Sequence, residues 1–318
     1  MEPVFPQILE AASRIAPFVH RTPVLTCRSL DRIYGAGLFF KCENLQKVGA
    51  FKIRGATNAV FCLGEEEASR GVATHSSGNH AAALAQAARW RAIPCYVVMP
   101  RDAPEVKKKA VEGYGAQITF CEPTLQAREQ TLQAIVRATG ATFIHPYNHP
   151  RVIEGQGTVA MELLEEVPSL DAVVVPVGGG GLLSGTALAI SARSPRTMVL
   201  AGEPERADDA IRSLREGRIL PPQNPDTVAD GLRTSLGTLT FPIIQRLVHS
   251  IFPVSEEAIL EAMRDIWERM KLVVEPSGAV PLAAVKVSGR LLEGKRVGII
   301  LSGGNVDLDR LPFRPAAT

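Results

Sequence analysis

The chain contains Val177-Gly178-Gly179-Gly180-Gly181-Leu182, where four consecutive glycines separate the apolar run 171–177 from the helix-forming segment 182–192. Without any Cβ in this run, backbone N–H groups can converge on a phosphate at the start of the helix. A flexible or tightly packed turn is the alternative, but four glycines are a costly way to build one. The run lacks the G-x-G-x-x-G and P-loop patterns, so it predicts a site for a small phosphate group.

Short apolar runs alternate with Ala-rich helical segments on both sides of the glycines, a pattern typical of an α/β fold with parallel sheets. The predicted helices are 81–90, 104–114, 125–139 and 182–192, and the predicted strands are 38–41, 71–74, 94–98, 117–120, 172–177, 198–202 and 297–301. In such folds, ligands bind at the carboxyl ends of the strands, so the turns after the strands are the candidate binding segments.

Composition excludes several classes of protein. The 318 residues suffice for one large or two modest domains, and a net charge of +2 favours neither nucleic acid nor a membrane surface as a partner. Five widely spaced cysteines without a C-x-x-C pair argue against a disulfide framework and a zinc site, and fit a reducing compartment. The N-terminus does not resemble a signal peptide, and no apolar stretch is long enough for a membrane helix. We therefore expect a soluble cytoplasmic protein.

Lys52 is the candidate reactive amine. It stands between Phe51 and Ile53 at the predicted start of a helix, within Gly49-Ala50-Phe51-Lys52-Ile53-Arg54-Gly55-Ala56. An amine beside apolar groups loses solvation, so its pKa falls and it can form an imine. Taken alone, however, the pattern fits a surface lysine with an extended side chain at least as well.

Two further turns carry polar groups. Ser76, Ser77 and Asn79 lie at the start of a predicted helix, where hydroxyl and N–H groups suit a carboxylate, although Ser77 or Asn79 could simply cap the helix. Ser302 follows the strand 297–301 and could bond a ring nitrogen, but an ordinary turn explains it equally well.

In their order and spacing, these four segments resemble the fold-type II pyridoxal-phosphate enzymes, specifically the serine racemase and serine/threonine dehydratase family. The resemblance covers nearly the whole chain. It includes Thr22-Pro23-Val24-Leu25, Lys41-Cys42-Glu43, Gly155-Gln156-Gly157-Thr158, Ala229-Asp230-Gly231 and Trp267-Glu268-Arg269-Met270-Lys271.

The resemblance implies a role for each turn. Lys52 is expected to hold pyridoxal 5'-phosphate as an imine, and the glycines Gly178, Gly179, Gly180 and Gly181 to bind its phosphate. Asn79 is expected at the phenolic oxygen and Ser302 at the ring nitrogen. Ser77 matches the hydroxyl that reprotonates the opposite face in the racemases, and is a second catalytic candidate. Phe51 and Glu275 complete the expected cofactor site, and the expected substrate-binding residues are Ser76, Ser77, Asn79, His80, Arg128 and Tyr147.

The resemblance also implies an architecture of two domains, each an open, mostly parallel sheet flanked by helices, as in the tryptophan synthase β-like enzymes. Residues 1–70 and 147–318 would form a large domain, and residues 71–146 a small mobile domain that closes over the active site. A homodimer is expected. Glu203, the carbonyl of Ala207 and Asp209 resemble the family's site for Mg²⁺ (or Ca²⁺ or Mn²⁺), although without the resemblance an acidic loop before a helix is the simpler interpretation.

The predicted activity is a dehydratase, or ammonia-lyase, reaction. It would eliminate water from a small 3-hydroxy amino acid (3-hydroxyaspartate, serine or threonine) and release a 2-oxo acid and ammonia. Ala50, where many family members have serine, favours 3-hydroxyaspartate, and Arg128 with His149 could bind its second carboxylate. A serine or aspartate racemase with secondary elimination stays open. So does a non-catalytic phosphate-ligand binding protein, but such a protein would not need Lys52, Ser77 and Ser302 together.

Overall fold

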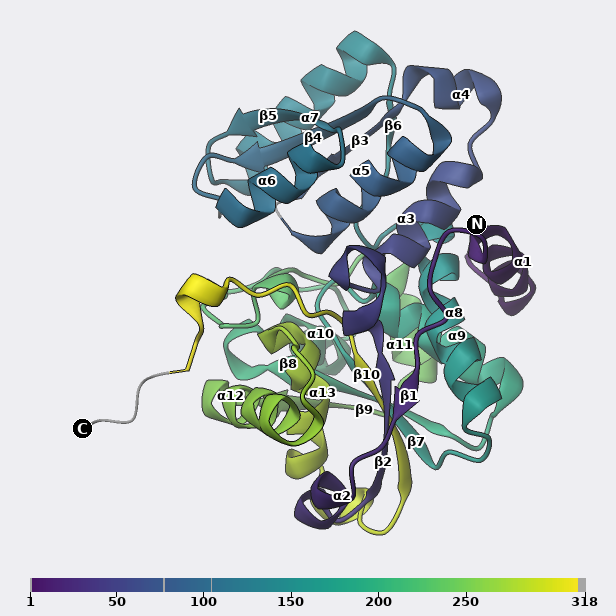
Figure 1. Cartoon of the computed structure of the whole chain (residues 1–318), viewed down its shortest axis with the longest axis vertical. Coiled ribbons are helices and arrows are strands. Elements are labelled where there is room, and N and C mark those ends of the chain that lie inside the picture. The colour runs from purple at the N-terminus through teal and green to yellow at the C-terminus, as the bar shows by residue number, and fades with distance from the viewer. Residues whose placement is uncertain (1, 77, 104, 314–318) are drawn as a thin grey trace.

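The computed structural model describes residues 2–76, 78–103 and 105–313, which form two sheets flanked by helices (Figure 1). The larger sheet has the strand order β1-β2-β10-β7-β8-β9, and the smaller has the order β5-β4-β3-β6. All pairs are parallel except the antiparallel pair of β1 with β2. The larger sheet comprises β1 (Val24–Leu25), β2 (Gly37–Cys42), β7 (Ala172–Pro176), β8 (Met198–Pro204), β9 (Ser250–Val254) and β10 (Arg296–Leu301). The smaller comprises β3 (Val72–His75), β4 (Cys95–Pro100), β5 (Gln117–Cys121) and β6 (Thr142–Phe143).

Helices flank both sheets (Figure 1). The helices are α1 (Phe5–Ile15), α2 (Arg28–Tyr34), α3 (Lys52–Phe61), α4 (Glu65–Arg70), α5 (Asn79–Arg91), α6 (Glu105–Gly113), α7 (Leu125–Thr139), α8 (Pro150–Glu166), α9 (Gly181–Arg193), α10 (Asp209–Glu216), α11 (Thr240–Leu247), α12 (Glu256–Asp265) and α13 (Pro276–Val287). None of the described helices has the length and apolar character that crossing a membrane requires.

Strand β7 shows why the central strands are continuous apolar runs. Val174 packs into the buried cluster on one face of the larger sheet, whereas Val173 and Val175 pack into the cluster on the other face. Because successive side chains of a strand point to opposite faces, a strand covered on both sides must be apolar at every position. The predicted α/β class with parallel sheets is therefore confirmed.

The predicted strands are all present, with ends shifted by up to a few residues, but three strands were not predicted. Two of them, β1 and β6, have only two residues each and therefore show no alternation. The third, β9, lies at the edge of the larger sheet and contains Pro253, a residue that edge positions tolerate.

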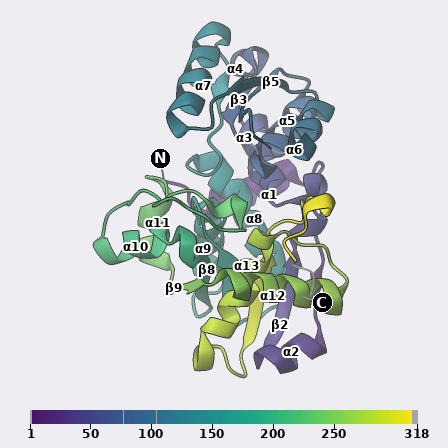
Figure 2. The same cartoon turned by 90° about the vertical axis from the view of Figure 1, so that its left-hand side faces the viewer.

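The two sheets lie in different parts of the molecule, one above the other in Figure 1 and again in the turned view of Figure 2. Strands β3 to β6 all fall within the predicted small domain, 71–146. Helix α3 precedes that range, yet Ile53 and Val60 share a buried cluster with Val72 and Val97 of the smaller sheet. The helix that Lys52 begins thus packs against α5, which covers the smaller sheet, as well as against α8.

Three of the predicted turns meet at one edge of the larger sheet. Strand β10 lies between β2 and β7, and all three run parallel. The glycine run follows β7, Ser302 follows β10, and Lys52 comes after β2. Since parallel strands end at the same edge, the fold places these segments together.

Candidate active site

A cavity of about 530 Å³ lies between the two sheets. It is lined from the larger-sheet side by residues around Lys52, the glycine run and Ser302, and from the smaller-sheet side by residues of α5 and α7. Ser77 lies outside the described residues, and His149 does not line the cavity. All the other predicted cofactor and substrate residues do: Phe51, Lys52, Ser76, Asn79, His80, Arg128, Tyr147, Gly178, Gly179, Gly180, Gly181, Glu275 and Ser302.

Lys52 is held inside this cavity. Its Nζ donates a hydrogen bond to the carbonyl oxygen of Pro146 at 2.9 Å and lies 5.1 Å from the centre of the Phe51 ring. Burial lowers the pKa of the Lys52 amine to about 8, although the charge of Glu275 acts in the opposite direction. The uncharged, nucleophilic form of the amine is therefore far more abundant near neutral pH than in an ordinary lysine.

The glycine run, Gly178–Gly181, leaves no room for larger side chains. Gly180 has φ of +84°, and a Cβ on Gly179 would lie 2.3 Å from the ring of Tyr147. Because α9 begins at Gly181, the N–H groups of its first turn lack helical partners at the wall of the cavity. A phosphate suits such a cradle, so the residues present fit the phosphate end of pyridoxal phosphate.

Asn79 is oriented from both sides. Its Nδ2 donates to Oε1 of Glu275 at 2.8 Å, and its Oδ1 accepts from Nδ2 of Asn305 at 2.9 Å. Helix α5 begins at Asn79 itself, with Gly78 as the capping residue, so the alternative interpretation, that Asn79 only caps the helix, is wrong. Asn79 lines the cavity, and its Nδ2 has a second N–H that Glu275 does not use.

Histidines His75 and His145 line the cavity beside His80, but only His80 was assigned to the site from the sequence. Nδ1 of His145 accepts hydrogen bonds from the backbone N–H groups of Tyr147 and Asn148, so Nε2 carries the proton. Burial lowers the pKa of His145 to about 4, and it lowers the pKa values of His75 and His80. All three are therefore neutral at pH 7. A signal was available for His75, which follows the predicted strand 71–74, but not for His145, because β6 before it was not predicted.

Arg128 and Tyr147 line the cavity in different ways. Arg128 lies on α7, and its Nε has no hydrogen-bond partner in the described part of the chain. The hydroxyl of Tyr147 forms a hydrogen bond with the hydroxyl of Thr234 at 2.8 Å, and its ring packs edge-on against His145 at 4.5 Å. Arg128 thus offers an unused cationic group, whereas Tyr147 is part of the wall.

The predicted metal residues lie where the end of β8 leads into α10, and none of them lines the cavity. Glu203 accepts hydrogen bonds from the backbone N–H groups of Ala210 and Ile211 at 2.7 and 2.9 Å. Burial raises the pKa of Glu203 to about 8 and that of Asp209 to about 7. Neither carboxylate oxygen of Asp209 has a hydrogen-bond partner among the described residues. Two such carboxylates fit a hard divalent cation. No group of three or more His, Cys, Asp or Glu side chains in the described ranges is placed to hold a metal by itself.

Comparison with known proteins agrees with this geometry. The family model described as "Pyridoxal-phosphate dependent enzyme" matches residues 15–303. The beta-hydroxyaspartate dehydratase of Paracoccus denitrificans is 53% identical over 311 residues, which cover 98% of this chain and 99% of that protein. The serine racemase of Oryza sativa subsp. indica is 51% identical, with 95% and 90% covered.

The structure of maize serine racemase superimposes with a TM-score of 0.95 at 48% identity, covering 97% of this chain and 95% of the other. The predicted fold type is therefore confirmed, and the chain is an enzyme of the same general type as these dehydratases and racemases. The chain belongs to the family of pyridoxal-phosphate dependent enzymes, in its serine racemase and dehydratase group.

Proposed function

We propose that this enzyme eliminates water from 3-hydroxyaspartate and releases oxaloacetate and ammonia. The observation that carries the proposal is Arg128, a half-buried cationic residue that lines the same cavity as Lys52 and whose buried Nε has no hydrogen-bond partner among the described residues. A substrate with a second carboxylate would supply the missing partner, because a guanidinium matches a carboxylate in charge and geometry. The 53% identity to a beta-hydroxyaspartate dehydratase supports the same choice.

The cofactor residues follow from the cavity. Lys52 would hold pyridoxal phosphate covalently, Gly178–Gly181 would bind its phosphate, Asn79 its phenolic oxygen and Ser302 its ring nitrogen; Phe51 and Glu275 would complete its surroundings. When bound, this cofactor stabilises negative charge at the Cα of an amino acid. A hydroxyl at the ring nitrogen, such as that of Ser302, leaves the ring largely neutral. Early departure of the 3-hydroxyl group is then favoured over a long-lived carbanion.

Lys52 would also act as the base. The pKa of its amine, about 8, is close enough to neutral pH for the amine to accept the Cα proton and to lose a proton again before the next turnover. The carbonyl of Pro146 holds Nζ at a fixed point of the wall, so the proton would leave from one face of the substrate. Elimination needs no proton delivered to the opposite face.

The substrate would lie between the start of α5 and helix α7. Ser76, Asn79 and His80 surround the first turn of α5, where the N–H groups suit the α-carboxylate. Arg128 of α7 would bind the second carboxylate, and Tyr147 would complete the wall. Closure of residues 71–146 over the substrate would exclude water from the cavity.

Racemisation of serine or aspartate is the second candidate. It is supported by the 51% identity to a serine racemase and by the sequence position of Ser77, a hydroxyl residue that could serve the opposite face. The two candidates share Lys52 as the base, but elimination expels a 3-hydroxyl group, whereas racemisation returns a proton to the opposite face of Cα.

The proposal has three further parts. Mg²⁺ (or Ca²⁺ or Mn²⁺) would bind Glu203, the carbonyl of Ala207 and Asp209, where it would neutralise two buried carboxylates. The active form would be a homodimer, and the enzyme would work in the cytoplasm. The family resemblance supports these three assignments.

The test is release of 2-oxo acid from the four stereoisomers of 3-hydroxyaspartate, L-serine and L-threonine, with cofactor and Mg²⁺ supplied. Preferential formation of oxaloacetate from a hydroxyaspartate supports the proposal, and Lys52→Ala should abolish it. Chiral analysis of serine and aspartate in parallel tests racemisation. If none of the six compounds yields an oxo acid, the enzyme is not a dehydratase of this kind.

A further inference from the structure

Arg54 is a fully buried arginine in the first turn of α3, the helix that Lys52 begins. Nε and Nη2 donate to the two carboxylate oxygens of Glu43 at 2.7 and 2.8 Å. Nη1 and Nη2 donate to the two oxygens of Glu162 at 2.6 and 2.8 Å. Further bonds reach Oγ1 of Thr158 at 3.2 Å and the carbonyl of His20 at 3.3 Å. The planar guanidinium is thus held in one orientation by two forked carboxylate contacts.

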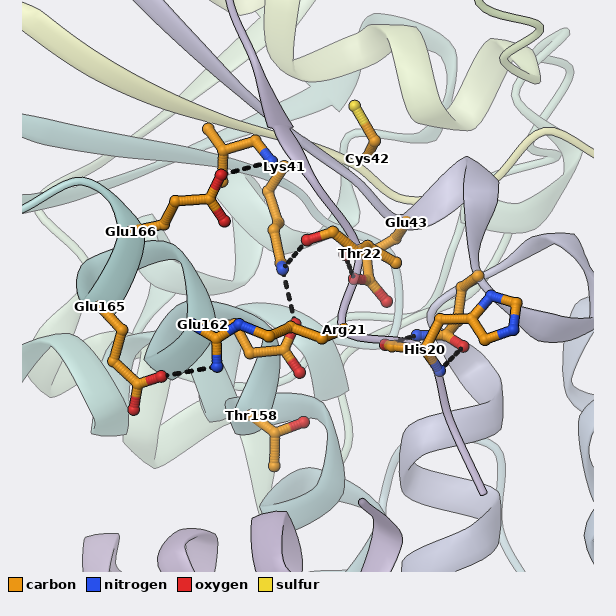
Figure 3. A network of polar contacts seen from close by, with 12 residues as sticks. His20, Arg21, Thr22, Lys41, Cys42, Glu43, Thr158, Glu162, Glu165 and Glu166 are labelled. Carbon is orange, nitrogen blue, oxygen red and sulfur yellow. Dashed lines mark hydrogen bonds and ion pairs between the residues drawn. The ribbon is translucent and has the colours of Figure 1, made fainter. Parts of the chain in front are cut away.

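A second buried cation completes the cluster, as Figure 3 shows for its labelled members. Nζ of Lys41 donates to Oε2 of Glu162 and to the carbonyl of Thr22, both at 2.6 Å, and the Thr22 hydroxyl donates to Glu43 at 2.6 Å. We call Lys41, Glu43, Arg54 and Glu162 the Arg54 network. Two cations and two anions balance within it, and it ties β2, α3 and α8 together.

Helix α8 also supports the helix that carries the glycine run. A Cβ on Gly155 of α8 would lie 2.6 Å from Cα of Gly55, and a Cβ on Gly185 of α9 would lie 2.5 Å from the backbone nitrogen of Gly157. The backbones of α3 and α9 therefore rest directly on α8. Lys52 stands at the start of α3, and the glycine run stands at the start of α9, so α8 sets the distance between them.

We propose that Arg54 is a positioning residue, which fixes the start of α3 on α8 and thereby sets the place of the Lys52 amine relative to the glycine cradle. This inference rests on the proposed role of Lys52. The glycine contacts fix how closely the helices approach, and Asn58, further along α3, donates to the carbonyl of Arg151 on α8 at 2.7 Å. At the first turn of α3, the forked contacts of Arg54 to Glu43 and Glu162 oppose sliding and rotation of the helix, because each fork accepts only one orientation.

Stability alone is a poor reason for such a network. Burying charges has a large desolvation cost, and replacement of a buried ion pair by apolar side chains of similar volume is often neutral or stabilising. A displacement of about 1 Å at a reacting group can reduce a rate about 100-fold. The network is thus better explained by the position that it imposes on α3.

The test uses two variants and a matched control. Arg54→Lys keeps the positive charge but cannot form the two-point contacts with the carboxylates of Glu43 and Glu162. The double variant Arg54→Met with Glu162→Met removes one cation and one anion, and leaves Lys41 beside Glu43. The control Arg21→Met breaks an exposed ion pair of 2.8 Å with Glu165, on the same helix as Glu162. Three quantities are measured: the melting temperature of the apoenzyme, the visible absorbance of lysine-bound cofactor against pH, and kcat and KM for 2-oxo acid release.

We expect the folded variants to form the covalent link with cofactor about 10-fold or more slowly and to show a shifted pH midpoint of its absorbance. The kcat should fall by about 10- to 100-fold with a much smaller change in KM. The control should match the wild type in every measurement. Wild-type absorbance and kcat in the double variant would overturn the proposal. Failure of both variants to fold would also overturn it, because the network would then serve the fold.

The absorbance measurement separates this inference from the proposed function. If the wild type forms the lysine link but releases no oxo acid, the dehydratase proposal fails, and the effect of Arg54 on the link is still measured. If Lys52→Ala forms the link as well as the wild type does, the role of Lys52 itself is wrong.

Discussion

Nδ2 of Asn79 donates a hydrogen bond to Oε1 of Glu275 at 2.8 Å, which places a carboxylate beside the amide proposed to contact the cofactor. The same carboxylate raises the pKa of Lys52, against the larger effect of burial. Glu275 therefore connects the orientation of one cofactor ligand to the protonation of the other. The effect on the pKa of Lys52 depends on the negative charge of Glu275, whereas the hydrogen bond from Asn79 needs only an acceptor oxygen.

Glu275→Gln should lower the pKa of Lys52 below its value of about 8, because the charge that favours the protonated amine is removed. The midpoint of cofactor attachment to the apoenzyme should move to lower pH. Glu129→Gln is the matched control, since Glu129 lines the same cavity but is not among the charges that act on Lys52. An unchanged midpoint in Glu275→Gln would contradict this account of the amine.

Gly179→Ala should weaken cofactor binding by about tenfold or more, because the new methyl group would meet the Tyr147 ring at 2.3 Å and displace the wall of the cradle. Equilibrium titration of the apoenzyme with cofactor measures the effect. Gly113→Ala is a suitable control, because a Cβ there meets nothing within 4 Å. Equal affinity of the two variants would show that the glycine run does not hold the phosphate.

The bond between Tyr147 and Thr234 should contribute about 1 kcal/mol to the free energy of unfolding. Tyr147→Phe and Thr234→Val should each lose that amount, and the double variant should lose little more than either single variant. Urea denaturation of the apoenzyme measures all four proteins. Fully additive losses would mean that the two hydroxyl groups do not interact.

His145 should make the apoenzyme less stable in acid. Its folded pKa of about 4 lies below the usual value of 6.5, so the unfolded chain takes up a proton first as the pH falls. The stabilisation is complete above pH 6.5 and is lost progressively between that pH and 4.

His145→Asn keeps an acceptor for the backbone N–H groups of Tyr147 and Asn148 but cannot titrate in this range. Its free energy of unfolding should therefore fall less between pH 7 and pH 5 than that of the wild type. His249→Gln, a change of an exposed histidine, should retain the wild-type slope. If the free energy of unfolding of His145→Asn fell as steeply as that of the wild type, a group other than His145 would cause the acid sensitivity.

Much of the fold could be predicted because its central strands are buried on both faces. The apolar runs at Ala172–Pro176 and Arg296–Leu301 are visible without any structure, and so are the glycine and serine turns that follow them. The two-residue strands β1 and β6 could not be found, since pairing with a neighbour defines them more than their own composition does.

The least predictable feature was the Arg54 network. Lys41 and Glu162 are 121 positions apart, and charged residues with no regular spacing are ordinarily interpreted as solvated surface groups. Only the packing of α3 on α8 shows that Arg54 is fully buried. His145 was overlooked because β6, the strand before it, was not predicted. His75 follows the predicted strand 71–74, but a single histidine forms no motif.

The most direct test of the central claim is the ratio of kcat/KM for 3-hydroxyaspartate to kcat/KM for L-serine, in the wild type and in Arg128→Met. If Arg128 binds the second carboxylate, the wild type should prefer its best hydroxyaspartate stereoisomer. In Arg128→Met this ratio should fall about 10- to 100-fold, while kcat/KM for L-serine changes little. A wild type that prefers serine, or a ratio that Arg128→Met leaves unchanged, would contradict the assignment of this enzyme as a hydroxyaspartate dehydratase.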